Sequence, residues 1–156
     1  CRAPIRYHAD GSITPRAQRF LPERAQSLAR AVEEKVARVR ANLPSGRVAP
    51  YARRMYFERT LAFMNAHGAR PVIVINPIHP AVLAVLKKDG FAARRAAALE
   101  YLNRLQRRLD FVVVECEDIG TWGGSTDDFL NATHINSRNM KRMLEYVVAH
   151  SDGALA

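Results

Sequence analysis

Two short, continuously apolar segments constrain the fold of this chain more than any other feature. They are "RPVIVIN" at residues 70–76 and "FVVVECE" at residues 111–117. Apolar runs of this length, without polar alternation, are typical of strands that are buried on both faces of a parallel sheet. A parallel pair also needs a long crossover connection, and residues 77–110 are enough to supply one from helices. The sequence therefore predicts two parallel strands joined through helices.

Helical patterns fill most of the remaining sequence. Thr14-Pro15 suits a helix start, Pro22 offers a later restart, and apolar positions then continue to about Asn42. Beyond a Pro- and Gly-containing loop at 43–50, helices are expected at 51–67, ended by Gly68, near 80–88, and near 91–108. Asn136 is expected to cap a last helix, whose predicted apolar stripe is Met140, Met143, Leu144, Val147 and Val148, with both methionines in the core.

This order of elements predicts an α/β fold, in which residues 1–156 form a single α/β domain. The expected architecture is a partial three-layer α/β/α sandwich with a short parallel sheet, of the flavodoxin-like kind. Two strands are too few for such a sheet, so it is predicted to be incomplete. Either the first third of the chain holds another strand, around Ile5–Tyr7, or the sheet lacks partners from a larger domain. We favour the larger domain, of which this chain is the C-terminal portion.

The distribution of charge and the spacing of the cysteines limit the classes of partner and cofactor that we expect. The net charge is +9, but the arginines are spread through helical segments and mixed with Glu and apolar residues. That distribution is typical of solvated helix faces, and no nucleic-acid-binding motif accompanies it, so the sequence predicts no nucleic-acid partner. Cys1 and Cys116 have no metal-ligand spacing, and we predict neither a metal nor a cofactor. Cys116 is expected to be a small buried apolar residue.

Three segments in order resemble the C-terminal half of SGNH/GDSL-type hydrolases. They are "ARPVIVINPIHPAVL", "FVVVECEDIGTWGG" and "DDFLNATHINSRN", within residues 69–148. More narrowly, they resemble the extracytoplasmic members of that family that are associated with envelope polysaccharide modification. The resemblance implies an SGNH-like domain, an extracytoplasmic or cell-envelope location, and a serine esterase or acyl transferase. No targeting segment is recognisable in the sequence itself.

The resemblance also implies roles for particular residues. His134 matches the general base, which an acidic residue three positions earlier holds in one tautomer. Asn131 stands at that position in place of the family's Asp, and Asp128 is the alternative orienter. The family's nucleophile lies in a Gly-x-Ser turn near the start of its domain. Here Ser12, Ser45 and Ser125 follow no apolar strand, and Ser125 with Asp128 fits a capping box instead. The nucleophile is therefore expected outside these residues.

Three further residues are expected to bind substrate. Asn76 and His79 follow the first predicted strand, where active sites of open α/β sheets gather, although rigid loop packing would also explain His79. Trp122 either lines a pocket or covers the core. His134 itself has a structural alternative, as a turn residue before an amphipathic helix.

Several functions stay open at this stage. The first is an ester hydrolase or acyl transferase acting on envelope glycan or lipid esters, with a membrane acyltransferase as a possible partner. For such an enzyme, Asn131 in place of the usual Asp lowers the expected activity, and the nucleophilic Ser is expected outside these residues. The alternative is a non-catalytic relative that binds a glycan or a protein partner in the same cleft, and a basic nucleic-acid binder comes third. Assembly into a homo-oligomer is compatible with each.

Overall fold

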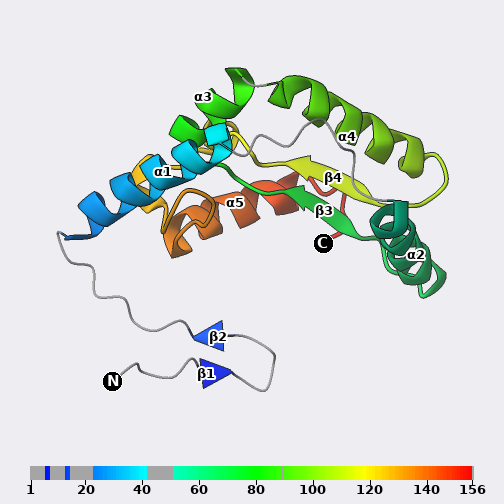
Figure 1. Ribbon diagram of the computed structural model, residues 1–156. Coiled ribbons are helices and arrows are strands. Elements are labelled where there is room, and N and C mark those ends of the chain that lie inside the picture. The colour runs from blue at the N-terminus through cyan, green and yellow to red at the C-terminus, as the bar shows by residue number, and fades with distance from the viewer. Residues whose placement is uncertain (1–5, 8–12, 15–22, 42–50, 89, 156) are drawn as a thin grey trace.

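The computed structural model describes residues 6–7, 13–14, 23–41, 51–88 and 90–155. Within them the protein is a mixed α/β structure that is mostly helical (Figure 1). The elements in chain order are β1 (Arg6–Tyr7), β2 (Ile13–Thr14), α1 (Glu23–Ala41), α2 (Tyr51–Ala66), β3 (Val72–Ile75), α3 (Pro80–Lys88), α4 (Phe91–Gln106), β4 (Val112–Glu115), the 3-10 turns η1 (Ile119–Trp122) and η2 (Thr126–Asp128), and α5 (Ser137–Ala149).

The two apolar segments form the predicted parallel pair. β3 lies beside β4 in register from Val72 opposite Val112 to Ile75 opposite Glu115, and α3 and α4 make the crossover. A strand also occurs at Arg6–Tyr7, inside the segment considered for a hidden strand. It pairs antiparallel with β2 in a separate sheet, however, so it does not extend the parallel sheet.

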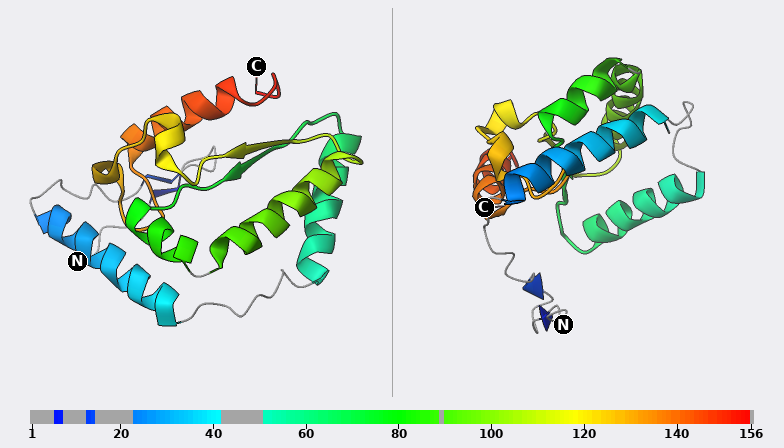
Figure 2. Two further views of the ribbon diagram at one scale, coloured as in Figure 1. Left: turned by 90° about the horizontal axis from the view of Figure 1, so that it is seen from above. Right: turned by 60° about the vertical axis from the view of Figure 1, so that its left-hand side comes forward.

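Alternation along β3 and β4 gives the parallel sheet two apolar faces. One face packs with Met143 and Val147 of α5, through strand residues Val72, Val74, Val112 and Val114. The other face packs with Leu61 of α2 and with Leu102 and Leu105 of α4, through strand residues Ile73, Ile75 and Val113. Figure 2 shows the sheet between α5 on one side and α4 on the other. Helices therefore cover both faces of the sheet.

A third apolar cluster ties α1 and α3 to the loop before α5. Val32 of α1, Val82 of α3 and Ala132 are buried together, with Ile78 packed against them. This packing is important for the candidate site, because Ala132 lies two residues before His134.

The first helix begins later than one prediction placed it. Thr14 belongs to β2, so a helix start at Thr14-Pro15 is wrong for that residue, and residues 15–22 lie outside the described part. The described helix begins at Glu23, directly after Pro22, as the alternative predicted. Gly68 ends α2 as expected, in the left-handed conformation with φ 77°, which glycine adopts without steric cost.

The orientation of α5 corrects another prediction. Asn136 caps this helix as expected, because its Oδ1 accepts hydrogen bonds from the backbone N–H groups of Arg138 and Asn139. Met143 and Val147 are buried, but Met140 is 40% exposed and is not a core residue. The rest of the predicted stripe, Leu144 and Val148, is about half exposed with it. The side chains at i, i+4 and i+8 share a helix face that no described element covers.

None of the described helices has the length and apolar character needed to cross a membrane.

Candidate functional site

His134 lies on a tight loop that is closed at its neck by paired backbone. Phe129 and Ile135 form an isolated antiparallel bridge. Inside it, the Leu130 N–H donates to the His134 carbonyl oxygen at 2.7 Å. Phe129 and Ile135 are both buried in the core beside β4, and this packing holds the two ends of the loop in place. His134 itself is exposed, so its ring can be reached from solvent.

The Asn131 side chain holds the His134 ring. Asn131 Oδ1 lies 2.9 Å from His134 Nδ1. The same oxygen accepts hydrogen bonds from the backbone N–H groups of Thr133 and His134, each at 3.0 Å. Two N–H donors identify this atom as the amide oxygen, so the ring can approach it only as a donor. The proton of neutral His134 is therefore on Nδ1, which leaves Nε2 as the acceptor.

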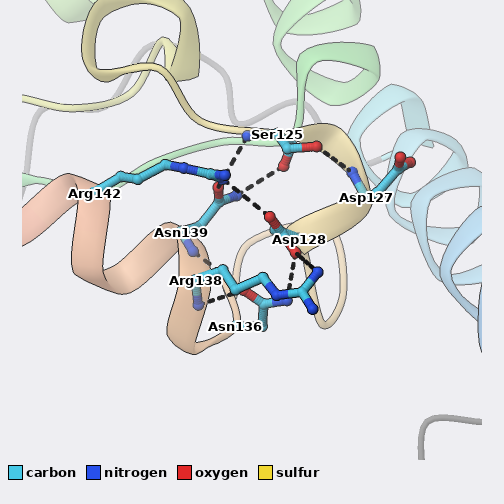
Figure 3. A network of polar contacts seen from close by, with 7 residues as sticks. All are labelled: Ser125, Asp127, Asp128, Asn136, Arg138, Asn139 and Arg142. Atoms are coloured by element: carbon cyan, nitrogen blue, oxygen red, sulfur yellow. Dashed lines mark hydrogen bonds and ion pairs between the residues drawn. The ribbon is translucent and has the colours of Figure 1, made fainter.

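Asp128, the alternative orienter, has other partners (Figure 3). Its Oδ1 accepts from Asn136 Nδ2 at 2.8 Å, and its Oδ2 accepts from Arg142 Nη1 at 3.0 Å. Arg138 Nη1 lies 4.0 Å from Asp128 Oδ1 and forms a further ion pair with it. Together, the hydrogen bond from Asn136 and these cations lower the pKa of Asp128 below its ordinary value. Among the described residues Asp128 makes no hydrogen bond to His134, and Asn131 is the residue that contacts the ring.

A buried amide completes this network and was not found from the sequence. Asn139 is fully buried, and its amide bonds both backbone groups of Ser125: Oδ1 accepts from the N–H at 2.9 Å, and Nδ2 donates to the carbonyl oxygen at 2.7 Å. Figure 3 shows how Asn139 and Asp128 join η2 to the first turns of α5. The available signal was the spacing Asn136, Asn139, Arg142, which places three polar side chains on one helix face.

His79 reaches the loop from the carboxyl end of β3. Its N–H donates to the Ala132 carbonyl oxygen at 3.1 Å, and its ring packs edge-on against Phe129 with centroids 5.1 Å apart. His79 Nδ1 accepts from the Ala81 N–H at 3.3 Å, at the start of α3. Burial lowers the pKa of His79, which favours the neutral ring. The structure thus brings His79 beside the His134 loop, while Asn76 is exposed at the end of β3.

Trp122 belongs to the core. It is 6% exposed, and its Nε1 donates to the Cys116 carbonyl oxygen at 3.0 Å. Of the two roles considered for Trp122, covering the core is the one that this burial fits. Cys116 is also fully buried as expected, and burial raises the pKa of its thiol to about 11, so it stays protonated at neutral pH.

Among the described residues, no candidate nucleophile contacts the His134 ring. Ser12 and Ser45 lie outside them. Ser125 caps η2, with its Oγ accepting from the Asp127 N–H at 3.3 Å, so the predicted cap is confirmed. The described residues also contain no group of three or more His, Cys, Asp or Glu side chains that could hold a metal ion.

The chain matches no known protein family, no curated protein and no solved structure.

Proposed function

We propose that this chain carries the base side of an SGNH-like serine ester hydrolase or acyl transferase that acts on glycan or lipid esters of the cell envelope. His134 is the general base and Asn131 its orienter in this proposal. The observation that carries it is the 2.9 Å contact between Asn131 Oδ1 and His134 Nδ1. It leaves Nε2 unprotonated on an exposed residue, and a base that activates a serine hydroxyl requires an unprotonated nitrogen.

The proposed chemistry follows from that tautomer. A serine Oγ–H would donate to His134 Nε2, and the proton would move there as the oxygen attacks an ester carbonyl. The ring would then be a cation, with Nδ1–H still bonded to Asn131. An amide orients the ring but lacks the negative charge that stabilises the cation. In a triad, an Asp-to-Asn change lowers turnover by about four orders of magnitude because the ring takes the wrong tautomer. Here Asn131 keeps the productive tautomer, so only the missing charge lowers the rate. Weak activity is therefore expected.

The finer fold proposed is an SGNH-like three-layer sandwich whose sheet continues beyond β3. All four residues of β3 are partly exposed, and they are apolar on both faces of the strand. A partly exposed strand with two apolar faces is unusual at the edge of a sheet. The outer face of α5, with Met140, Leu144 and Val148, is exposed as well. A further strand beside β3, with a helix packed on α5, would cover both. The serine would lie at the carboxyl end of such a strand, from residues other than those described.

A turn residue is the competing role for His134. Asn131 Oδ1 already closes the turn through the N–H groups of Thr133 and His134, which needs no imidazole. The ring contact is the feature that a turn does not require. A non-catalytic relative that binds a glycan or partner would not require this contact either, so the contact supports the esterase proposal.

The test is ester hydrolysis by the protein at its full natural length. Release of p-nitrophenol from p-nitrophenyl acetate would be measured for wild type, Asn131→Asp and His134→Ala. Asn131→Asp should raise the rate by at least about a hundredfold, since the carboxylate stabilises the imidazolium. His134→Ala should abolish hydrolysis and also labelling of a serine by a fluorophosphonate.

Matched controls separate this effect from changes of charge or of histidine content. Asn103→Asp makes the same amide-to-acid change on the exposed side of α4, and His150→Ala removes an exposed histidine after α5. Both should leave the rate unchanged. If Asn131→Asp gives no gain and no serine is labelled, catalysis is excluded and the binding relative is favoured.

A further inference from the structure

The outer face of α2 carries two aromatic rings in an unusually open position. Tyr56 is 65% exposed and Phe63 is 64% exposed, more than any other large apolar side chain in the described part of the chain. Single exposed apolar side chains are common on protein surfaces, so a binding site is inferred here from how these two rings and their charged neighbours are arranged. Phe63 is seven positions after Tyr56, which is about two helical turns, so the rings lie on one line about 10 Å apart.

Basic side chains flank this aromatic line. Arg53 and Arg59, three residues before and after Tyr56, are both exposed and lie on opposite flanks of the line. His67 packs against Phe63 with ring centroids 4.2 Å apart and continues the line.

The aromatic line itself carries no carboxylate. Glu58 is the only acidic residue of α2, and it lies off this line. There it accepts hydrogen bonds from the Tyr101 hydroxyl at 3.0 Å and from Arg108 Nη2 at 3.2 Å. The carboxylate of α2 is thus paired with Tyr101 and Arg108. Exposed Arg53 and Arg59 flank the aromatic line, and Glu58 borders it only on the Arg59 side.

We propose that this face binds an acidic polysaccharide. Pyranose rings would pack their C–H faces on Tyr56 and Phe63, while their carboxylates pair with Arg53 and Arg59, whose planar guanidinium groups suit carboxylates. The inference extends the proposed function by naming the class of glycan. It concerns binding alone, so it can fail while the esterase proposal stands, and the reverse is also true.

The ring spacing favours a polysaccharide over a single-stranded nucleic acid. Bases that remain stacked on one another are about 3.4 Å apart along a strand, so two rings about 10 Å apart cannot both stack on neighbouring bases of such a strand. Two rings about 10 Å apart instead suit alternate sugars of an extended pyranose chain. Nucleic acid is therefore the main competing ligand in the test.

Binding would be measured by isothermal titration calorimetry with polygalacturonate, dextran and oligo-dT at low salt. We expect binding to polygalacturonate that weakens as salt is raised, and none to neutral dextran. The double variants Tyr56→Ala/Phe63→Ala and Arg53→Gln/Arg59→Gln should each weaken polygalacturonate binding about tenfold or more. The control Leu155→Ala removes an exposed apolar side chain outside α2 instead and should bind as wild type does.

Three outcomes would overturn the inference. Equal affinity of wild type and both α2 variants would place any binding elsewhere. Equal binding of dextran would remove the role of charge. Tighter binding of oligo-dT than of polygalacturonate would assign the surface to nucleic acid. Circular dichroism of each variant would show that α2 remains folded, because all four substituted side chains are exposed.

Discussion

At the residue scale, one amide oxygen has two functions in the His134 loop. Asn131 Oδ1 closes the turn through two backbone N–H groups and also fixes the His134 ring. The spacing of three residues that the SGNH resemblance implied predicted this contact from sequence, because residues three apart in a tight turn can meet. The true partners of Asp128 were not predictable in this way. Asn136 and Arg142 reach it only because η2 folds back onto α5.

Close packing at Trp122 gives a prediction for Gly124. A Cβ at position 124 would lie 2.6 Å from two carbons of the Trp122 ring and 2.9 Å from Ile119 Cβ. Gly124→Ala must therefore displace the buried indole, and we expect a loss of about 1–3 kcal/mol in the free energy of unfolding. Urea denaturation followed by fluorescence would measure it, since Trp122 is the chain's single tryptophan. Unchanged stability and emission would show that the ring is not packed on Gly124.

At the element scale, the polar network between η2 and α5 sets the position of the loop. It holds the segment on both sides of the Phe129–Ile135 bridge, since Asp128 precedes the bridge and Asn136 follows it. The Asn136 N–H also donates to the Asp128 carbonyl oxygen at 2.8 Å. The loop that carries His134 is thus fixed by η2 and α5 rather than by its own residues alone.

Acid should weaken this network. The pKa of Asp128 is lowered in the folded protein, so its stabilising contribution is complete above the ordinary value of 3.8 and is lost as the pH falls through the folded pKa. At pH 7, Asp128→Asn should lower the free energy of unfolding by about 2 kcal/mol, a typical value for hydrogen bonds to a charged group.

Urea unfolding at pH 7 and at pH 3 would test this dependence. The difference between wild type and Asp128→Asn should shrink at the lower pH. Asp127→Asn is the matched control, because Asp127 is exposed next to it and should show a far smaller effect. A difference that stays constant between the two pH values would mean that the carboxylate is not the stabilising group.

The orientation of α5 is tested by two adjacent valines. Val147 is 3% exposed and Val148 is 52% exposed. Val147→Ala should cost about 2 kcal/mol of unfolding free energy through the cavity it leaves, and Val148→Ala less than about 0.5 kcal/mol. Thermal and urea unfolding of the two variants would measure the contrast. Equal losses would mean that both valines are buried, as a single core-facing stripe had suggested.

At the scale of the whole molecule, the parallel sheet and its helices follow from sequence, but the extent of the sheet does not. Apolar runs and end signals such as Gly68 and Asn136 located β3, β4 and the later helices, because these signals act locally. The side of α5 that faces the core could not be read from Met140 or Leu144. Met140 and Leu144 belong to the same apolar stripe as Met143. Which of these side chains is buried depends on which neighbouring elements pack against the helix.

The tautomer of the neutral His134 ring, which the contact with Asn131 fixes, can be measured directly. Two-dimensional ¹H–¹⁵N NMR of the histidine rings would show which nitrogen of His134 carries the proton when the ring is neutral. We expect the proton on Nδ1, with Nε2 unprotonated, and Asn131→Ala should abolish this preference. A proton on Nε2 in the wild-type protein would rule out His134 as the proposed base, because that nitrogen could not then accept a proton from a serine.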